Sequence, residues 1–277
     1  MSSSLISETA LSHWIENFYG YGSWEAPLWF INHEEPSGDM PEEVADKLTY
    51  FREAQTEENS PTLCDLRALY KQVRFIPQRS RADTFANLYD YRFGPNAVQR
   101  GEWKGIISLV HGYTNQPISD AETCLEYQRY SLATGANNEA LLRLYPLPAH
   151  SHAWYYSWLN LKGMDFLKSR TAYQEHVYEV RMQAILEQIR ISNPKLVVMH
   201  DMKSINTLKE SVQANFPRVK FTTVKAIPRK IPQHHITRLP EIETTIVITT
   251  QSTGLRHNRP ETGFDWGAFG RELSVEC

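Results

Sequence analysis

The chain has 277 residues, of which 41% are hydrophobic and 22% are charged, and its net charge at pH 7 is −3. This composition and length exclude a disordered chain and predict one folded domain spanning 1–277. The weakly negative charge excludes a protein that binds DNA by bulk electrostatics, so any DNA contact must come from local basic clusters. No apolar run approaches the roughly 18 residues of a membrane span. The first residues also lack a signal-peptide pattern, so we expect a cytoplasmic protein without membrane contact.

The first clear element is residues 28–31, an apolar run that is too short for a helix. It predicts a buried strand that continues into the polar loop 32–38. This loop carries two adjacent carboxylates, Glu34 and Glu35, immediately before Pro36. Paired acids in a loop are often merely solvated, but their position directly after a buried strand favours a functional role.

Residues 40–135 are the hardest to assign, and we interpret them as helices within a long insertion. Helical patterns cover 42–54 and 62–73, and an aromatic, polar region follows. Its aromatic side chains either belong to the core or offer flat faces to a ligand; they include Tyr89, Tyr91, Trp103 and Tyr113.

The second half of the chain alternates apolar runs with helical periodicity, as βαβ units do. Pro146 and Pro148 end one strand, and Asn193 with Pro194 ends the clearest helix. The predicted strands are 140–145, 195–200, 219–224 and 244–250, and the predicted helices are 173–191 and 204–214.

Ligands of open parallel sheets bind beyond the carboxyl ends of the strands. We therefore expect the strands at 28–32, 140–145, 195–200 and 244–250 to be neighbours, with their following loops on one side.

These four strand-plus-loop motifs resemble the uracil-DNA glycosylase superfamily. The matching features are a carboxylate-plus-Pro loop, a strand ending in Pro-Leu-Pro, the run Pro-Lys-Leu-Val-Val, and a last strand ending in a Ser-containing loop. They cover residues 28–38 and 140–257. The resemblance implies a three-layer α/β/α fold around a mostly parallel four-stranded sheet, and an enzyme that cleaves the N-glycosidic bond in DNA.

The resemblance places the catalytic carboxylate at Glu35, with Glu34 as the alternative, where it would stabilise an oxocarbenium-like sugar and orient water. It also implies base flipping, which uses small polar residues on phosphates and a wedge side chain. The implied substrate-binding residues are Asn32, His33, Ser37, Arg143 and His150. The implied DNA-binding residues are Ser151, Ser252, Leu255 as the wedge, Arg256 and Arg259.

Departures from the family pattern bear on the substrate. Ser37 and Gly38 stand where a bulky aromatic usually excludes 5-substituted pyrimidines. Arg143, which offers donors only, replaces the Asn that reads uracil. The last loop keeps Ser252 but has Gln251 in place of the family's His, so the leaving group would need another partner such as Arg256, His257 or His150. We therefore expect a pyrimidine with a bulky 5-substituent, namely α-glucosylated 5-hydroxymethylcytosine of phage DNA, and a role in antiviral defence.

Two other functions stay open, an ordinary uracil-DNA glycosylase and a non-catalytic nucleic-acid-binding relative. The sequence contains no phosphate-binding loop, dinucleotide fingerprint or nucleophile elbow, so no cofactor is expected. The histidine pairs lack a third ligand at a recognisable spacing, so no metal is expected either. Three isolated cysteines predict reduced thiols. The oligomeric state is not predicted. Basic clusters that could contact DNA are Lys225, Arg229, Lys230, His234, His235 and Arg238, and then Arg256, His257 and Arg259.

Overall fold

The computed structural model describes residues 5–35, 40–55, 60–76, 85–117, 120–136, 138–149, 154–159, 161–227, 230–254 and 264–276. These residues form an α/β structure around one mixed sheet of eight strands, in the order β3-β1-β4-β2-β5-β8-β7-β6. The α/β class is confirmed, whereas the expected four-stranded sheet is wrong because four further strands extend it at both edges.

The middle of the sheet consists of four parallel strands, β4 (Glu139–Arg143), β2 (Leu28–Asn32), β5 (Leu196–His200) and β8 (Thr244–Thr249). Every residue of these strands is buried, as is usual for parallel strands covered on both faces. These are the strands predicted from their apolar runs, so the expectation that they are neighbours is confirmed.

The edge strands are where the sequence predictions fail. On one side, β1 (Phe18–Tyr21) pairs antiparallel with β4 and parallel with β3 (Thr62–Cys64). On the other side, β7 (Lys230–Leu239) pairs antiparallel with β8 and with β6 (Thr222–Ile227). The helix predicted over 62–73 is therefore wrong in its first part, since only α3 (Leu66–Gln72) is helical. Asp65 begins that helix by accepting hydrogen bonds from two backbone amides, which separates it from β3.

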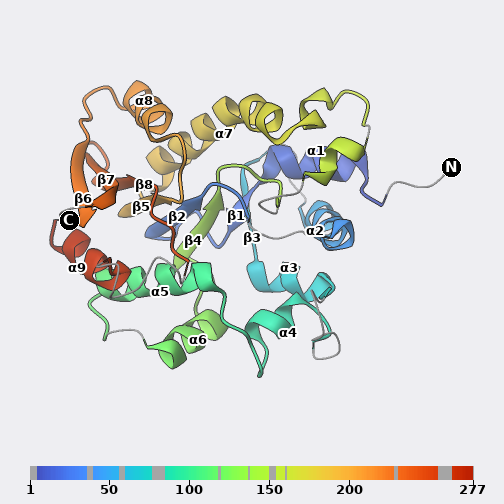
Figure 1. Cartoon of the computed structure of the whole chain (residues 1–277), viewed down its shortest axis with the longest axis horizontal. Coiled ribbons are helices and arrows are strands. Elements are labelled where there is room, and N and C mark those ends of the chain that lie inside the picture. The colour runs from blue at the N-terminus through green and yellow to red at the C-terminus, as the bar shows by residue number, and fades with distance from the viewer. Residues whose placement is uncertain are drawn as a thin grey trace.

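Helices cover both faces of the sheet, as Figure 1 shows. One face carries α1 (Glu8–Asn17), α7 (Arg170–Ser192) and α8 (Ile205–Asn215), and the other carries α5 (Gly101–Tyr113) and α9 (Trp266–Glu276). Ser169 caps the start of α7, and Asn193 ends it in the left-handed conformation just before Pro194. The predicted helices 173–191 and 204–214 are thus confirmed.

The segment 40–135 supplies more than surface helices. It contains α2 (Pro41–Ala54), α4 (Leu88–Phe93), α6 (Ala121–Tyr130), the strand β3 and the helices α3 and α5. Two short 3-10 helices, Tyr155–Trp158 and Asp165–Lys168, precede α7. Helices α5 and α9 can approach closely because Gly112 has no side chain. A Cβ atom at this position would overlap the backbone of Gly267.

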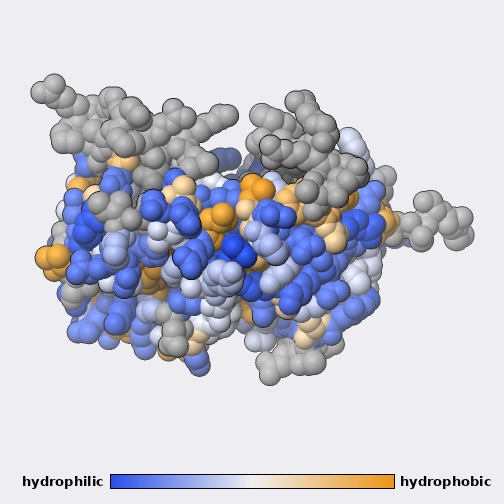
Figure 2. All heavy atoms as spheres, turned by 90° about the horizontal axis from the view of Figure 1, so that it is seen from below, coloured by the Kyte–Doolittle hydropathy of each residue, from blue (hydrophilic) through white to orange (hydrophobic). Residues whose placement is uncertain are grey.

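The surface seen from below the view of Figure 1 is mainly hydrophilic, with hydrophobic residues in small groups (Figure 2). Among the described residues, no helix is long and apolar enough to cross a membrane. The described residues of the basic cluster between Lys225 and Arg238 belong to the β6–β7 pair, and His234 is buried; Arg229 lies outside the described residues.

Candidate active site

Three polar residues lie side by side at the carboxyl ends of the parallel strands. Asn32 of β2 is in register with Arg143 of β4 on one side and with His200 of β5 on the other. Residues in register across a sheet point to the same face, and all three are at least 95% buried here. We call Arg143, Asn32 and His200 the strand-end row.

Glu102, in the first turn of α5, connects two members of this row. Its Oε1 accepts a hydrogen bond from Asn32 Nδ2 at 2.8 Å and one from Arg143 Nη1 at 2.7 Å. Burial alone would raise the pKa of Glu102, but Arg143 and Arg100 outweigh it and lower that pKa to about 2. Glu102 is therefore a fixed negative charge beside the strand-end row at neutral pH.

The side chain of His200 completes the row. Both ring nitrogens are buried and make no hydrogen bond to any described residue. Burial lowers the pKa of His200 to about 4, with nearby Glu102 acting in the opposite direction. The imidazole is thus neutral at pH 7 and presents one donor and one acceptor.

The loops after β2 and β4 run along each other. Leu144 N donates to Asn32 O at 2.9 Å, and Tyr145 N donates to His33 O at 2.9 Å. Further along, Ala149 N donates to Glu35 O at 3.1 Å. The loops after β5 and β8 are also joined, because Asp201 N donates to Gln251 O at 3.0 Å. All four loops therefore meet at one edge, as predicted.

Glu35 lies in a buried cluster of charged and phenolic groups. Its Oε1 accepts from Lys47 Nζ at 3.0 Å and from Tyr70 OH at 3.3 Å, and its Oε2 accepts from Tyr21 OH at 2.9 Å. Arg100 Nη1 is 3.7 Å from the same carboxylate. Two cations beside Glu35 favour its ionised form.

Arg100 joins this cluster to the strand-end row, because its Nη2 lies 3.3 Å from Glu102 Oε2. Lys47 stays protonated: burial lowers its pKa, but Glu35 and Glu43 together raise it above the ordinary value. The cations Lys47, Arg100 and Arg143 thus alternate with carboxylates in one buried network.

Glu34 points to a different element. Arg170, at the start of α7, pairs with both carboxylate oxygens of Glu34, and Gln174 Nε2 donates to Oε1. Glu34 and Glu35 are therefore adjacent in sequence but held by different helices, and Glu35 alone of the two joins the network of the strand-end row.

His33, between Asn32 and Glu34, packs edge-on against the Tyr145 ring with centroids 4.7 Å apart. Burial lowers the pKa of His33 to about 4, and Glu34 acts against this shift. His33 is therefore neutral at pH 7 and lines the junction between the first two loops.

Of the DNA-binding residues that the family resemblance implies, only Ser252 is among the described residues. It is partly exposed in the loop after β8, and its Oγ accepts a hydrogen bond from Gly254 N at 3.2 Å. Ser37, Gly38, His150, Ser151, Leu255, Arg256, His257 and Arg259 lie outside the described residues.

The aromatic residues of 40–135 differ in their surroundings. Trp103 is 1% exposed and stacks on Phe93 with centroids 5.7 Å apart, so it belongs to the core. Tyr89, Tyr91 and Tyr113 are partly exposed.

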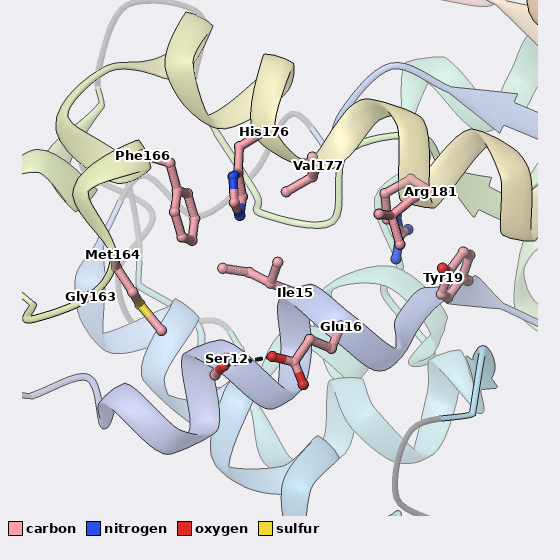
Figure 3. A pocket seen from close by; sticks show the side chains of 11 residues that line it. Ser12, Ile15, Glu16, Tyr19, Gly163, Met164, Phe166, His176, Val177 and Arg181 are labelled. Atoms are coloured by element: carbon pink, nitrogen blue, oxygen red, sulfur yellow. Dashed lines mark hydrogen bonds between the residues drawn. The ribbon is translucent and has the colours of Figure 1, made fainter.

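A pocket of about 350 Å³ lies between α1, β1 and α7 (Figure 3). Its wall includes Ile15, the stacked pair Phe166 and His176, and Arg181 over the Tyr19 ring. The buried guanidinium of Arg181 donates to the carbonyl oxygens of Phe18, Arg143 and Leu144. This pocket therefore adjoins the backbone that supports the strand-end row.

Sequence reasoning missed Glu102, His200, Lys47 and Arg100. Position offered one signal for His200, which is the last residue of the predicted strand 195–200. The other three come from a segment whose placement over the sheet no local pattern reveals.

Comparison of the chain with models of protein families, with curated proteins and with solved structures found no match. Within the described ranges, no group of three or more His, Cys, Asp or Glu side chains could hold a metal ion.

Proposed function

We propose that this chain is a DNA glycosylase that hydrolyses the N-glycosidic bond of a modified pyrimidine and leaves an abasic site. One observation carries the proposal: the strand-end row and the acidic loop after β2 lie together at the carboxyl edge of the parallel strands. After β2 the chain continues to β3 and then β4 on one side, and after β5 it continues to β6, β7 and β8 on the opposite side. The β2–β5 boundary is thus a topological switch point, where α/β folds bind ligands.

Glu35 is the carboxylate that we propose for the chemistry. Loss of a base leaves positive charge on the sugar, and a fixed carboxylate stabilises that charge as it develops. The hydrogen bonds from Lys47, Tyr21 and Tyr70 hold Glu35 in one orientation, so little reorganisation is needed during the reaction. Glu34, held by α7, is the alternative.

The proposed base is a cytosine with a bulky 5-substituent, α-glucosylated 5-hydroxymethylcytosine of phage DNA, and the proposed role is antiviral defence. Support for this finer proposal comes from the sequence, since Ser37 and Gly38 leave no bulky side chain after Pro36. Hydroxyl groups of the sugar would bind to polar side chains such as Asn32 and His33.

Uracil is the second candidate base, and Glu102 favours it. Arg143 alone offers only donors, but Glu102 Oε1 lies 2.7 Å from Arg143 Nη1 and brings an acceptor to the same place. A donor beside an acceptor suits uracil. Arg143 therefore does not argue against uracil as strongly as its side chain alone suggests.

The test compares abasic-site formation on glucosylated phage DNA, the same DNA with unglucosylated 5-hydroxymethylcytosine, and uracil-containing DNA. Preferential cleavage of the glucosylated DNA is expected. Preferential cleavage of uracil would select the second candidate, and DNA binding without base release would indicate a non-catalytic binder.

A further inference from the structure

Buried polar atoms without hydrogen-bond partners gather around the strand-end row. In the described part of the chain they include both ring nitrogens of His200, Nε of Arg143 and Oγ1 of Thr253. These residues come from β5, β4 and the loop after β8. All three are at most 2% exposed.

Helix α5 connects these positions. Glu102 pairs with Arg143 and acts electrostatically on His200, while Gly105, one turn further along α5, lies against the backbone of Thr253. Residues three apart lie on the same helix face. The three residues that carry the unpartnered atoms therefore all lie near α5 at the carboxyl edge of the sheet.

Unpartnered buried polar groups cost free energy, and native proteins retain them mainly where function requires them. We propose that His200 is a substrate-contacting, specificity-determining residue that hydrogen-bonds the polar edge of the flipped base. This inference rests on the proposed function, because it assigns His200 to the same site.

A neutral imidazole suits this task. The ring offers either a donor or an acceptor to a given neighbour, depending on its tautomer, and Arg143 Nε adds a donor nearby. Cytosine and uracil edges both present donors and acceptors. The substrate thus supplies the missing hydrogen bonds, and a base that cannot supply them leaves buried groups unpaired.

His234 provides a matched control. It is also 1% exposed, both its ring nitrogens lack partners among the described residues, and its pKa is also lowered to about 4 by burial. However, His234 lies on the antiparallel strand β7, which β8 separates from β5, and it stacks on Phe269 with centroids 4.3 Å apart. His200→Leu and His234→Leu make the same chemical change at the two positions.

The experiment measures the melting temperature and kcat/KM for base release of both variants, on the DNA that the wild type cleaves best. We expect His200→Leu to keep or raise the melting temperature and to lower kcat/KM by about tenfold or more. His234→Leu should change kcat/KM by less than about twofold. Equal kcat/KM values in the two variants would overturn the role of His200.

A second readout separates this inference from the proposed function. If the wild type releases no base from any DNA, the proposed function fails, and NMR then monitors the side-chain nitrogens of His200 and His234 during addition of 2′-deoxycytidine and 2′-deoxyuridine. A shift at His200 and none at His234 would support the contact. No shift at His200 with either nucleoside would overturn it.

Discussion

At the scale of single residues, Glu34 and Glu35 are neighbours in the chain but are held by different elements. Glu35→Gln removes the charge that we expect to stabilise the sugar cation. Base release should fall by about a hundredfold or more, while DNA binding stays largely intact, because the missing charge acts mainly on the transition state. Single-turnover base release and equilibrium binding measure the two effects, with Glu34→Gln as the companion variant.

Glu35→Gln will also destabilise the protein, because Lys47 and Arg100 each lose a carboxylate partner and keep only Glu43 and Glu102, respectively. Losses of about 3–5 kcal/mol are typical when a buried ion pair is broken. Glu139→Gln is the control: Glu139 is also buried but lies at the opposite end of β4, bonded to Tyr127 OH at 2.7 Å. Its base release per folded molecule should be unchanged. Full activity in both Glu34→Gln and Glu35→Gln would exclude a carboxylate mechanism.

Three buried histidines should make folding stability depend on pH. Burial lowers the pKa values of His33, His200 and His234 from 6.5 to about 4. Between these values the unfolded chain binds protons that the folded protein does not. Their contribution is therefore complete above pH 6.5 and is lost as the pH falls to about 4, at about 1.4 kcal/mol per pH unit for each histidine.

Urea unfolding at pH values from 7 to 4.5 measures this dependence. His234→Leu should reduce the slope by about 1.4 kcal/mol per pH unit, since one titrating group is removed. If the variant and the wild type show the same slope of unfolding free energy against pH, His234 must be protonated to the same extent in the folded and the unfolded protein.

The residues of the site differ in how far the sequence could reveal them. The position of Glu35 in the loop after an apolar strand marked it, and the resemblance to a glycosylase family marked Asn32 and Arg143. Lys47 falls within a correctly predicted helix, yet nothing local shows that its ammonium is buried beside Glu35. Glu102 belongs to α5, and only the packing of this helix over the sheet brings it to Asn32.

At the scale of elements, α5 positions both Glu102 and the loop after β8. A methyl group at Gly105 would overlap the carbonyl oxygen of Thr253. Gly105→Ala should therefore displace this loop and lower both the unfolding free energy, by about 1–3 kcal/mol, and the rate of base release. Urea unfolding and single-turnover kinetics measure the two effects.

Gly112→Ala is the control on the same helix, because its methyl group would overlap the backbone of Gly267 in α9. It should destabilise the protein to a similar extent but leave base release per folded molecule unchanged. Equal loss of activity in the two variants would show that α5 acts only through general stability.

Among the elements, continuous apolar runs predicted the four parallel strands and their shared edge. Strands β1 and β3 were missed because their patterns are weaker: β1 has four residues, and β3 has three directly before a capped helix. The strand expected over 219–224 begins later, at Thr222. Pairing with distant strands decides such segments, and a local pattern does not contain that information.

At the scale of the whole molecule, the net charge of −3 requires DNA contact to be local. Arg256 and Arg259, which follow the Ser252 loop in sequence, are the proposed phosphate-binding residues. Replacing both with Gln should weaken duplex binding and reduce its log–log salt dependence by roughly 0.9 for each phosphate that the variant no longer neutralises. Binding titrations at several salt concentrations measure this slope, and an unchanged slope would show that these residues face away from DNA.

The central claim, cleavage of an N-glycosidic bond, is tested most directly by mass spectrometry of the small molecules released from glucosylated phage DNA by the wild type and by Glu35→Gln. The wild type should release the free glucosylated base and leave the phosphodiester backbone unbroken until abasic sites are cleaved by heat or alkali. Glu35→Gln should release at least about a hundredfold less. Release of nucleotides, or of no base from glucosylated, unglucosylated and uracil-containing DNA alike, would contradict the account.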